Sequence, residues 1–467
     1  MAETTLLPMD VTELFPRYTE KLVRTGLAAA ETLLLGTGEA PSVGNSEGKD
    51  FSPPPTPGGR AGAAPPLSGD APVWNRADPL TAPLGKTAAR LGRRAVIAAP
   101  PAEPYRTMLR HLATGPAGII RPQDFETRIF LTDLPVLPSL AEEELAAALQ
   151  KRRAAVTRDG MIIATARRDL ETAFVIYNAV CFAVFVKFFS DLLPPRPGDA
   201  RSPAGTTGEP AGNATGSTTG RPFIPARPRE TETLLAGILS RLNHPGRSAA
   251  AAAAAIPLHA GPFTAATAIR EAIAATGRKT VAAGLVNANF GNISYRRDNE
   301  LFITGRGSAL DDLAADRILA VPLPGPSPRD AGASTELPAH RRIVLETPYR
   351  AVLHGHPPFT VILSMDCPEH DCPQRGGCHR TCPRPRQLAG VPVVSGEAGG
   401  GPYGLGNTVP PAVREAGAAI VYGHGVFTAG EEDFRGAFAR LEELETACRE
   451  LVLRMIPGLH SLGAGSL

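Results

Sequence analysis

Three histidines beside apolar segments are the side chains of this chain best suited to metal chemistry. His354 and His356 follow the apolar run 351–353, and alternation along a strand would point both imidazoles to the same side. His424 lies between two glycines after the apolar run 418–421, and glycines permit the tight turn that a buried site needs. Three histidines are the usual minimum of protein ligands for catalytic zinc. The HxH pair alone would not be specific.

Other chemistry-bearing residues lie ahead of the HxH strand. Ser334, Thr335 and Glu336 are predicted to open a short helix, whose N-terminal amides suit an anion; a capped surface helix is the alternative. Two glycine-rich loops, 289–294 and 304–308, offer backbone N–H groups that can cradle phosphate. Such loops are also common as simple turns.

Five segments in order resemble the class II aldolase/adducin family, most closely its fuculose-phosphate-type aldolases: FGNIS, FITGRGS, STELPAH, VLHGH and YGHGVFTAG. The resemblance covers residues 263–455. It implies a three-layer αβα fold around a central, mainly antiparallel sheet, and a homotetramer. An ordered set of motifs is far more specific than any single one.

The resemblance also assigns roles to individual residues. His354, His356 and His424 match the family's zinc ligands, and Glu336 matches its catalytic acid, where related epimerases have Asp. His340 matches a position that we interpret as a structural hydrogen-bonding residue. The positions that match the substrate-phosphate lining are Gly291, Asn292, Thr304, Gly305, Ser334 and Thr335.

These roles imply a zinc-dependent aldehyde-lyase of carbohydrate metabolism that acts on a small ketose phosphate through an enediolate. The alternatives are a sugar-phosphate dehydratase, decarboxylase or epimerase on the same zinc site, and a non-catalytic adducin-like interaction module. The chain departs from the related aldolases at two tyrosines. It has Val393 to Gly396 where they carry one, and its C-terminal tail lacks the other.

A second departure is an insertion after the HxH strand that holds four cysteines: Cys367, Cys372, Cys378 and Cys382. Four thiolates can form a structural zinc site that folds only with metal. Two disulfides and free thiols are the alternatives.

Composition divides the chain into four parts. The 48 Gly and 47 Pro residues are about a fifth of the chain, against about an eighth in average usage, which indicates linkers. We expect residues 1–94 to be mostly disordered, 95–193 to form a separate small α/β domain of unknown function, 194–261 to be a flexible linker with a short helix, and 262–458 to be the aldolase/adducin domain.

Apolar periodicity predicts the main elements. Helices are expected over 140–156, 169–193, 264–277 and 433–455, with Gly277 as the stop of the third. Strands are expected over 128–132, 161–164, 292–295, 301–304, 351–354, 361–363 and 418–422.

Charge and hydropathy argue against some partners. With 48 basic and 46 acidic side chains, the chain lacks the large positive charge that would attract nucleic acid or an anionic membrane. The uncharged apolar run 172–186 is shorter than the roughly 20 residues of a membrane-spanning helix, so we expect a buried core helix there. The N-terminus does not resemble a signal peptide, which predicts a cytoplasmic location.

Overall fold

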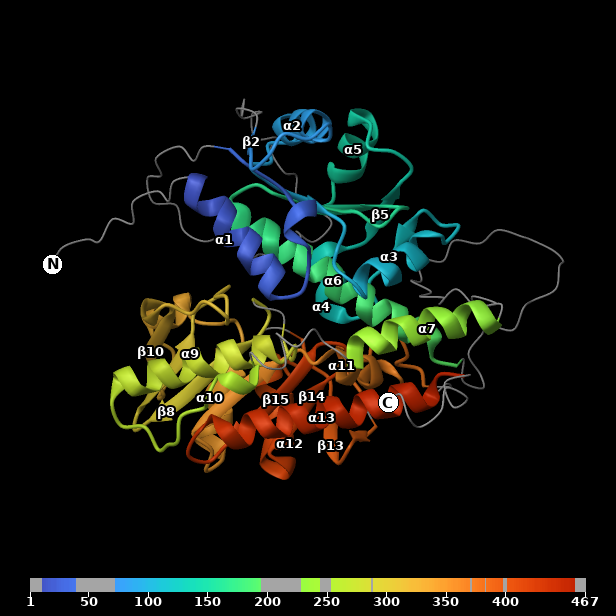
Figure 1. Cartoon of the computed structure of the whole chain (residues 1–467). Coiled ribbons are helices and arrows are strands. Elements are labelled where there is room, and N and C mark those ends of the chain that lie inside the picture. The colour runs from blue at the N-terminus through green and yellow to red at the C-terminus, as the bar shows by residue number, and fades with distance from the viewer. Residues whose placement is uncertain are drawn as a thin grey trace. The chain divides into compact units, whose positions relative to one another are not determined.

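The computed structural model of the chain (Figure 1) describes residues 11–38, 72–194, 228–243, 253–286, 289–369, 372–382, 384–397 and 401–457. Contacts divide it into two compact units, one mainly up to Lys187 and the other mainly from Phe188 onward. The predicted linker residues 39–71 and 195–227 lie outside the described residues.

The C-terminal unit is built on one eight-stranded sheet in the order β10-β9-β8-β11-β15-β14-β13-β12. All neighbouring strands are antiparallel except β13 and β14. The sheet is therefore mainly antiparallel, as expected. The strands are β8 (Asn292–Arg297), β9 (Glu300–Thr304), β10 (Ile318–Pro322), β11 (Ala351–Gly355), β12 (Gln387–Leu388), β13 (Val391–Val394), β14 (Ala418–Val421) and β15 (Gly425–Gly430).

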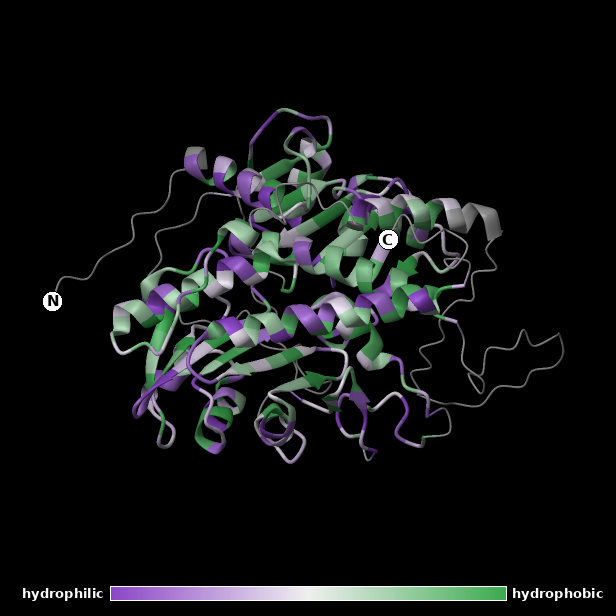
Figure 2. Ribbon diagram, turned by 60° about the horizontal axis from the view of Figure 1, so that its bottom comes forward, coloured by the Kyte–Doolittle hydropathy of each residue, from purple (hydrophilic) through white to green (hydrophobic). Residues whose placement is uncertain are grey.

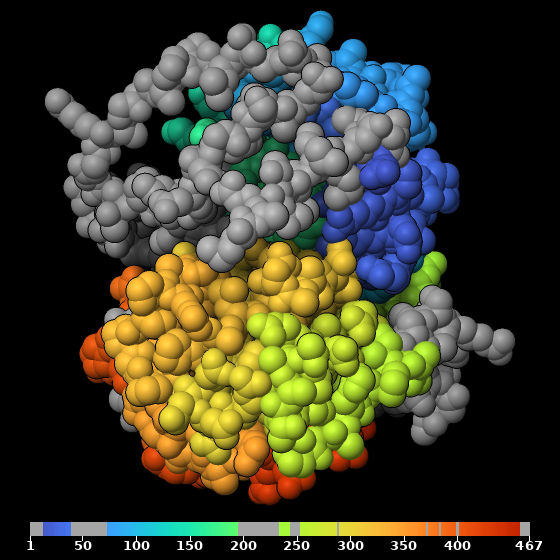
Figure 3. Space-filling model, turned by 90° about the vertical axis from the view of Figure 1, so that its left-hand side faces the viewer, coloured from blue at the N-terminus to red at the C-terminus, as the bar shows by residue number. Residues whose placement is uncertain are grey.

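Helices cover both faces of this sheet, because alternate strand residues feed two separate cores. One core joins the sheet to α9 and α13, and the other joins it to α10 and α12. Figure 2 shows the strands largely in the hydrophobic colour, and Figure 3 shows α9 beside the segment that contains β8. The helices are α9 (Ala266–Ala282), α10 (Leu337–Glu346), α11 (Pro358–Met365), α12 (Leu405–Ala416) and α13 (Phe434–Met455).

Two sequence predictions for this unit were wrong. Residues 361–363 lie in helix α11 and not in a strand, because Pro358 begins a helix whose residues 359–364 are all buried. Helix α9 continues past Gly277 to Ala282. A Cβ at position 277 would lie 2.4 Å from the carbonyl oxygen of Leu310, so this glycine permits close packing within the helix instead of ending it.

The N-terminal unit contains a seven-stranded sheet in the order β2-β1-β3-β7-β6-β5-β4. Its strands are β1 (Leu34–Thr37), β2 (Val73–Trp74), β3 (Ala95–Ala99), β4 (Ile119–Ile120), β5 (Leu134–Leu137), β6 (Ala154–Thr157) and β7 (Ile162–Ala166). Its helices are α1 (Val11–Arg24), α2 (Thr81–Arg90), α3 (Tyr105–Ala113), α4 (Phe125–Leu131), α5 (Glu142–Leu149) and α6 (Leu170–Leu192).

The prediction that residues 1–94 are mostly disordered needs correction, because α1, β1, β2 and α2 form there and β1 pairs with β3. The strand predicted over 128–132 lies within α4 and its C-terminal cap, since Asp124 caps that helix through the amide of Thr127. The helix predicted over 140–156 ends at Leu149, and β6 follows. Within the predicted linker, α7 (Pro228–Asn243) is a regular helix.

Helix α6 is long and apolar enough to cross a membrane, but 94% of its most apolar 18-residue stretch is buried inside the protein. Burial of this kind is typical of a core helix, which is how the sequence was interpreted.

The close packing at Gly277 predicts the effect of adding one methyl group. Gly277→Ala should lower the thermal unfolding temperature, because overpacking of this kind costs about 1–3 kcal/mol. Gly436→Ala is the matched control: position 436 is also helical, with open space around a Cβ, so alanine there should be neutral or stabilising. Equal effects of the two substitutions in calorimetry would contradict this packing.

Candidate metal centre

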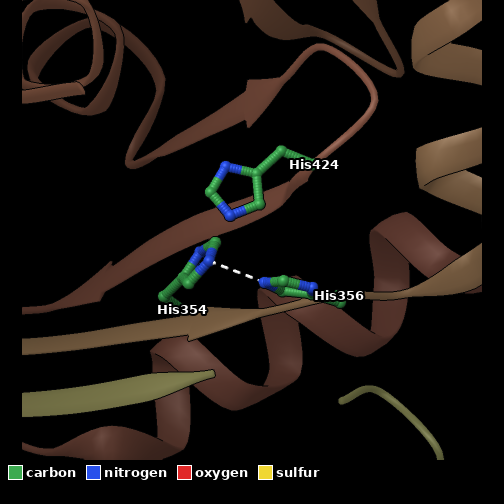
Figure 4. A group of neighbouring side chains, drawn as sticks. All are labelled: His354, His356 and His424. Atoms are coloured by element: carbon green, nitrogen blue, oxygen red, sulfur yellow. Dashed lines mark hydrogen bonds between the residues drawn. The ribbon is translucent and has the colours of Figure 1, made fainter. Parts of the chain in front are cut away.

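The three histidines named from the sequence lie together in the C-terminal unit (Figure 4). His354 is on β11, His356 follows that strand, and His424 lies in the β14–β15 turn. Their candidate ligand nitrogens all lie within 4.8 Å of one another, and the Nε2 atoms of His354 and His356 are 2.9 Å apart. Nitrogens bound to one tetrahedral zinc ion would be about 3.3 Å apart, so the cluster has the size of a single-ion site.

The protonation of these rings suits a metal ligand. The Nδ1 atom of His354 lies 3.0 Å from the carbonyl oxygen of Val426 and donates to it, so that in the neutral ring Nε2 is the nitrogen that carries the lone pair. Burial, together with the neighbouring histidines, lowers the pKa of His356 well below its usual value. Neutral, buried imidazoles with converging lone pairs fit a zinc ion.

Glycine is required where the rings meet the backbone. A Cβ at Gly425 would lie 2.5 Å from the carbonyl oxygen of Gly355, and within 3 Å of ring atoms of both His354 and His356. The preceding Gly423 has a φ of 59° and donates its amide hydrogen to Ser364 Oγ, which fixes the turn that carries His424. The sequence YGHG is therefore a geometric requirement of the cluster.

Glu336 faces the histidines from the N-terminus of α10. Its Oε2 atom is 3.3 Å from Nε2 of His354, and its Oε1 atom is 3.3 Å from Nε2 of His424. Burial alone would raise the pKa of this carboxyl, but the positive charge of His354 and His424 when protonated, together with hydrogen bonds from His424 and Asn292, outweighs burial and holds the pKa far below its usual range. With the imidazoles neutral, a cation bound among them would supply that positive charge.

A chain of buried hydrogen bonds holds the Glu336 carboxylate. Asn292 Nδ2 donates to Oε2 of Glu336 at 2.8 Å, so its Oδ1 atom must accept from Nε2 of His340. The other ring nitrogen of His340 then accepts from the hydroxyl of Ser294 at 2.7 Å. Burial lowers the pKa of His340 to about 3, so its ring is neutral, as this chain of donors requires. This arrangement matches the structural role predicted for His340.

The structure brings the phosphate candidates together only in part. An isolated bridge pairs Gly305 with Ala333 and sets the 304–305 and 333–334 segments side by side. The Gly305 amide donates to the carbonyl oxygen of Arg317, so it is not free for an anion. Ser334 Oγ accepts from the amide of Glu336, and Thr335 is exposed.

Two further candidates carry packing or support roles. A Cβ at Gly291 would lie 2.6 Å from the carbonyl oxygen of His354, so this glycine lets the chain pass close to β11. Thr304 Oγ1 accepts from the amide of Ile293.

Sequence reasoning missed several supporting residues. Phe427 stacks on His354 with ring centroids 4.1 Å apart. Ser308, the last residue of the predicted phosphate loop 304–308, has a buried hydroxyl with no hydrogen-bond partner among the described residues. Ser294 and Phe427 lie inside the FGNIS and YGHGVFTAG motifs, but their spacing alone gave no indication of their roles.

The four cysteines of the insertion are free thiols in the structure. Among the residues that the structure describes, the cluster of three histidines is the one group of three or more His, Cys, Asp or Glu side chains close enough to share a metal ion. His370, within the insertion, lies outside the described residues. The second metal site at Cys367, Cys372, Cys378 and Cys382 therefore stays a prediction.

Comparisons with known proteins place this site in a family. The model of the "Class II Aldolase and Adducin N-terminal domain" family matches residues 271–452. The C-terminal part of this chain belongs to the class II aldolase and adducin family. The three histidines and Glu336 all lie within the matched residues.

Relatives of this part of the chain include both aldolases and a dehydratase. A probable bifunctional methylthioribose-1-phosphate isomerase/methylthioribulose-1-phosphate dehydratase of Nocardia farcinica is 30% identical over 206 residues, which are 39% of this chain and 35% of that protein. This chain thus spans about a third of the length of that relative.

Solved structures similar to this part of the chain include an L-fuculose-1-phosphate aldolase from Thermus thermophilus. It is 31% identical and covers 42% of this chain and 97% of its own, with a TM-score of 0.33. A sugar-phosphate aldolase from Thermotoga maritima is 22% identical and covers 42% of this chain and 96% of its own, with a TM-score of 0.29.

A carboxylate on α13 supports the segment that follows His356. Glu445 accepts hydrogen bonds from the amides of Phe359 and Thr360, both at 2.9 Å, at the N-terminus of α11. Burial outweighs these hydrogen bonds and raises the pKa of Glu445 to about 7. The first turn of α11 is therefore held by a group that titrates near neutral pH.

Glu445→Gln should remove one pH-dependent contribution to stability. Because the folded pKa lies above the unfolded one, the wild type binds the extra proton when folded and loses stability as pH rises from about 4.5 to about 7, by up to about 1.4 kcal/mol per pH unit. The difference in unfolding temperature between wild type and E445Q should therefore change across this window. The exposed Glu442, changed to Gln, is the control. A pH-independent difference for E445Q would contradict the assignment.

Proposed function

We propose that the C-terminal unit is a metal-dependent lyase that acts on a small phosphorylated ketose. The observation that carries this proposal is the approach of the Glu336 carboxylate to within 3.3 Å of two imidazoles in one buried cluster. A general acid–base group beside a three-histidine metal site is the arrangement that proton transfer at a metal-polarised carbonyl needs.

The donor set fits zinc, with His354, His356 and His424 as the ligands. A bound zinc ion would supply an electrophile that stabilises negative charge as it develops on the carbonyl and neighbouring hydroxyl oxygens of the substrate. Three neutral histidines leave the full charge of the ion available for this purpose.

Glu336 is the group that moves the proton. The Asn292 amide donates to one of its oxygens, so the carboxylate is held in one orientation while its other oxygen faces the histidine cluster. Positioned general acid–base groups contribute about 10²–10⁴-fold in rate. Asn292 and His340 act through Glu336 and are positioning residues.

The segments 304–305 and 333–335 are the proposed site for the substrate phosphate. Their side-by-side arrangement sets the backbone of Thr304 beside Ser334, whose amide donates to the Thr304 carbonyl oxygen. Because Gly305 has no free amide, hydroxyl groups carry more of this role than the sequence suggested. A phosphate held here would orient the reacting carbons toward Glu336.

Two reactions use these groups. In aldol cleavage, Glu336 takes the proton of a substrate hydroxyl, a C–C bond breaks, and the resulting enediolate is protonated. In dehydration, Glu336 takes a proton from the carbon next to the carbonyl and passes it to the hydroxyl on the following carbon, which leaves as water as the C=C bond forms. The similarity to a methylthioribulose-1-phosphate dehydratase and the lack of tyrosine over Val393–Gly396 favour dehydration as the second candidate.

A homotetrameric assembly is proposed on the family resemblance alone, and the cytoplasmic location stays a prediction of the sequence analysis. The alternative of a non-catalytic adducin-like module is disfavoured because a binding module has no physical need for a buried carboxylate beside three histidines.

The proposal predicts separate losses of metal and of chemistry. His354→Ala and His424→Ala should each remove the zinc ion of the histidine cluster, measured as a loss of one zinc ion per chain. Glu336→Gln should keep the zinc, because the amide retains the shape and the acceptor for Asn292, yet lower the turnover of ketose phosphates by about 10²-fold or more.

The assay uses the full-length protein and a panel that includes fuculose 1-phosphate and methylthioribulose 1-phosphate. Aldehyde release reports cleavage, and loss of water without chain cleavage reports dehydration. The exposed Glu442→Gln should leave turnover unchanged. The lyase proposal would be contradicted if the wild type carries zinc and yet converts every substrate of the panel no faster than the E336Q variant does.

A further inference from the structure

The two units of the chain share one sheet topology. In order across the sheet, β2-β1-β3-β7-β6-β5-β4 of the N-terminal unit corresponds to β9-β8-β11-β15-β14-β13-β12 of the C-terminal unit. Each of these sheets contains one parallel pair, β5 with β6 and β13 with β14, and the pairs occupy the same place in the order. Only β10 has no counterpart among the described strands.

The helices follow the same order along the chain. A helix precedes the first strand of each unit (α1 and α9), and another precedes the central strand (α2 and α10). A third follows that strand (α3 and α11), a fourth joins the parallel pair (α5 and α12), and a long helix follows the last strand (α6 and α13). Helix α4, between β4 and β5, is an addition of the N-terminal unit, because a short turn joins the corresponding strands β12 and β13.

Strand pairing aligns the two units residue by residue. Ala98 pairs with Leu34 on one side and Ile163 on the other. His354 pairs with Asn292 and Phe427 in the same way.

The connections have matching lengths as well. Val156 and its partner Ile162 are six positions apart in the sequence, and so are Ile420 and its partner Val426. Helix α2 begins 14 positions before β3, and helix α10 likewise begins 14 positions before β11.

Equivalent side chains repeat the same contacts. Lys21 lies over the ring of Phe174 at 4.5 Å, and Lys279 lies over the ring of Phe438 at 5.3 Å. Each lysine precedes by five residues a glycine in the left-handed region, Gly26 with φ 67° and Gly284 with φ 69°. Topology, register and these contacts agree on one alignment, which chance similarity of two α/β sheets would not produce.

The chemistry does not repeat. By this alignment, Leu34 stands in place of Asn292, Leu80 in place of Glu336, and Leu84 in place of His340. The three histidine positions are occupied by Ala98, Pro100 and Gly160. Leu34, Leu84 and Ala98 belong to one buried hydrophobic cluster, with Leu80 packed against it. None of these side chains can bind a metal ion or transfer a proton.

We infer that the N-terminal unit is a second, divergent copy of the fold of the C-terminal unit, in which apolar core has replaced the metal centre. Each chain then carries one catalytic centre and one copy without metal chemistry. The equivalence rests on backbone pairing and packing, and only the count of catalytic centres depends on the proposed function.

Metal counting tests the loss of the site. With cobalt as a spectroscopic probe, the full-length wild type should bind one nitrogen-ligated ion per chain, and H354A/H356A/H424A should bind none. Thiolate charge-transfer bands would identify any ion at the cysteines separately. A nitrogen-ligated ion that persists in the triple variant, at nearly the wild-type amount, would overturn the inference.

Grafting tests the alignment. In the H354A/H356A/H424A background, the substitutions A98H, P100H and R158Y/D159G/G160H/M161G should restore cobalt binding, because they install the three ligands and both glycines of the turn at equivalent positions. The matched control is the same graft with Ala98 retained, which should bind at least tenfold more weakly. A graft that folds, with wild-type circular dichroism, and binds no better than this control contradicts the alignment.

A crystal structure of the wild type decides the matter if the graft does not fold. The two sheets should superpose with Ala98 on His354, Leu34 on Asn292 and Gly160 on His424. A best superposition displaced by one residue or more along any strand would overturn the inference. A wild type without bound metal would instead contradict the proposed function, while the superposition would still decide the equivalence.

Discussion

The C-terminal unit depends on one constraint, which is that three imidazoles and a carboxylate are buried at the end of an otherwise apolar sheet. Buried polar groups are tolerated only when each finds a partner, and a buried charge is far more costly than a buried dipole. His354 meets this constraint through the Val426 carbonyl, and Glu336 through Asn292 and two of the histidines. The same interactions leave the lone pairs of the cluster pointing at one another, an arrangement that a cation relieves.

The surrounding elements can be understood as consequences of this constraint. Strand β11 must approach the turn before β15 closely, so Gly425 has no side chain, and Gly355 has none because Leu285 and Leu441 pack against it. Helix α10 must begin beside the cluster, and its N-cap residue is Glu336, the proposed acid–base group. Support comes from behind, where His340 bridges Asn292 and Ser294 inside the protein. Rigid strands and buried hydrogen bonds thus hold the site more firmly than loops would.

The sequence predicted the histidine cluster and Glu336 because five ordered motifs of histidine, acidic and glycine residues fit few other kinds of site. It reached the strands around His354 and His424 and the long helices α6 and α13 for a related reason, since long or strongly patterned segments have few competing conformations. It was wrong at residues 361–363 and 128–132, where a short apolar run fits a strand and a buried helix equally well. It also missed the elements before residue 95, because β1 and β2 are separated by a long glycine- and proline-rich stretch.

The repeated fold could not be recognised from the sequence, because the features that the two units share depend on the backbone and on very few side chains. Backbone register, the φ of Gly26 and Gly284, and the lysine–phenylalanine contacts need only a few specific residues. The rest of the core tolerates wide substitution among apolar side chains. Where the C-terminal unit must bury Asn292 and His354 with partners, the N-terminal unit buries Leu34 and Ala98 with none required. The two units together separate what the fold needs from what the proposed chemistry needs: the N-terminal sheet forms around apolar side chains at these positions, so the fold itself does not require the polar cluster.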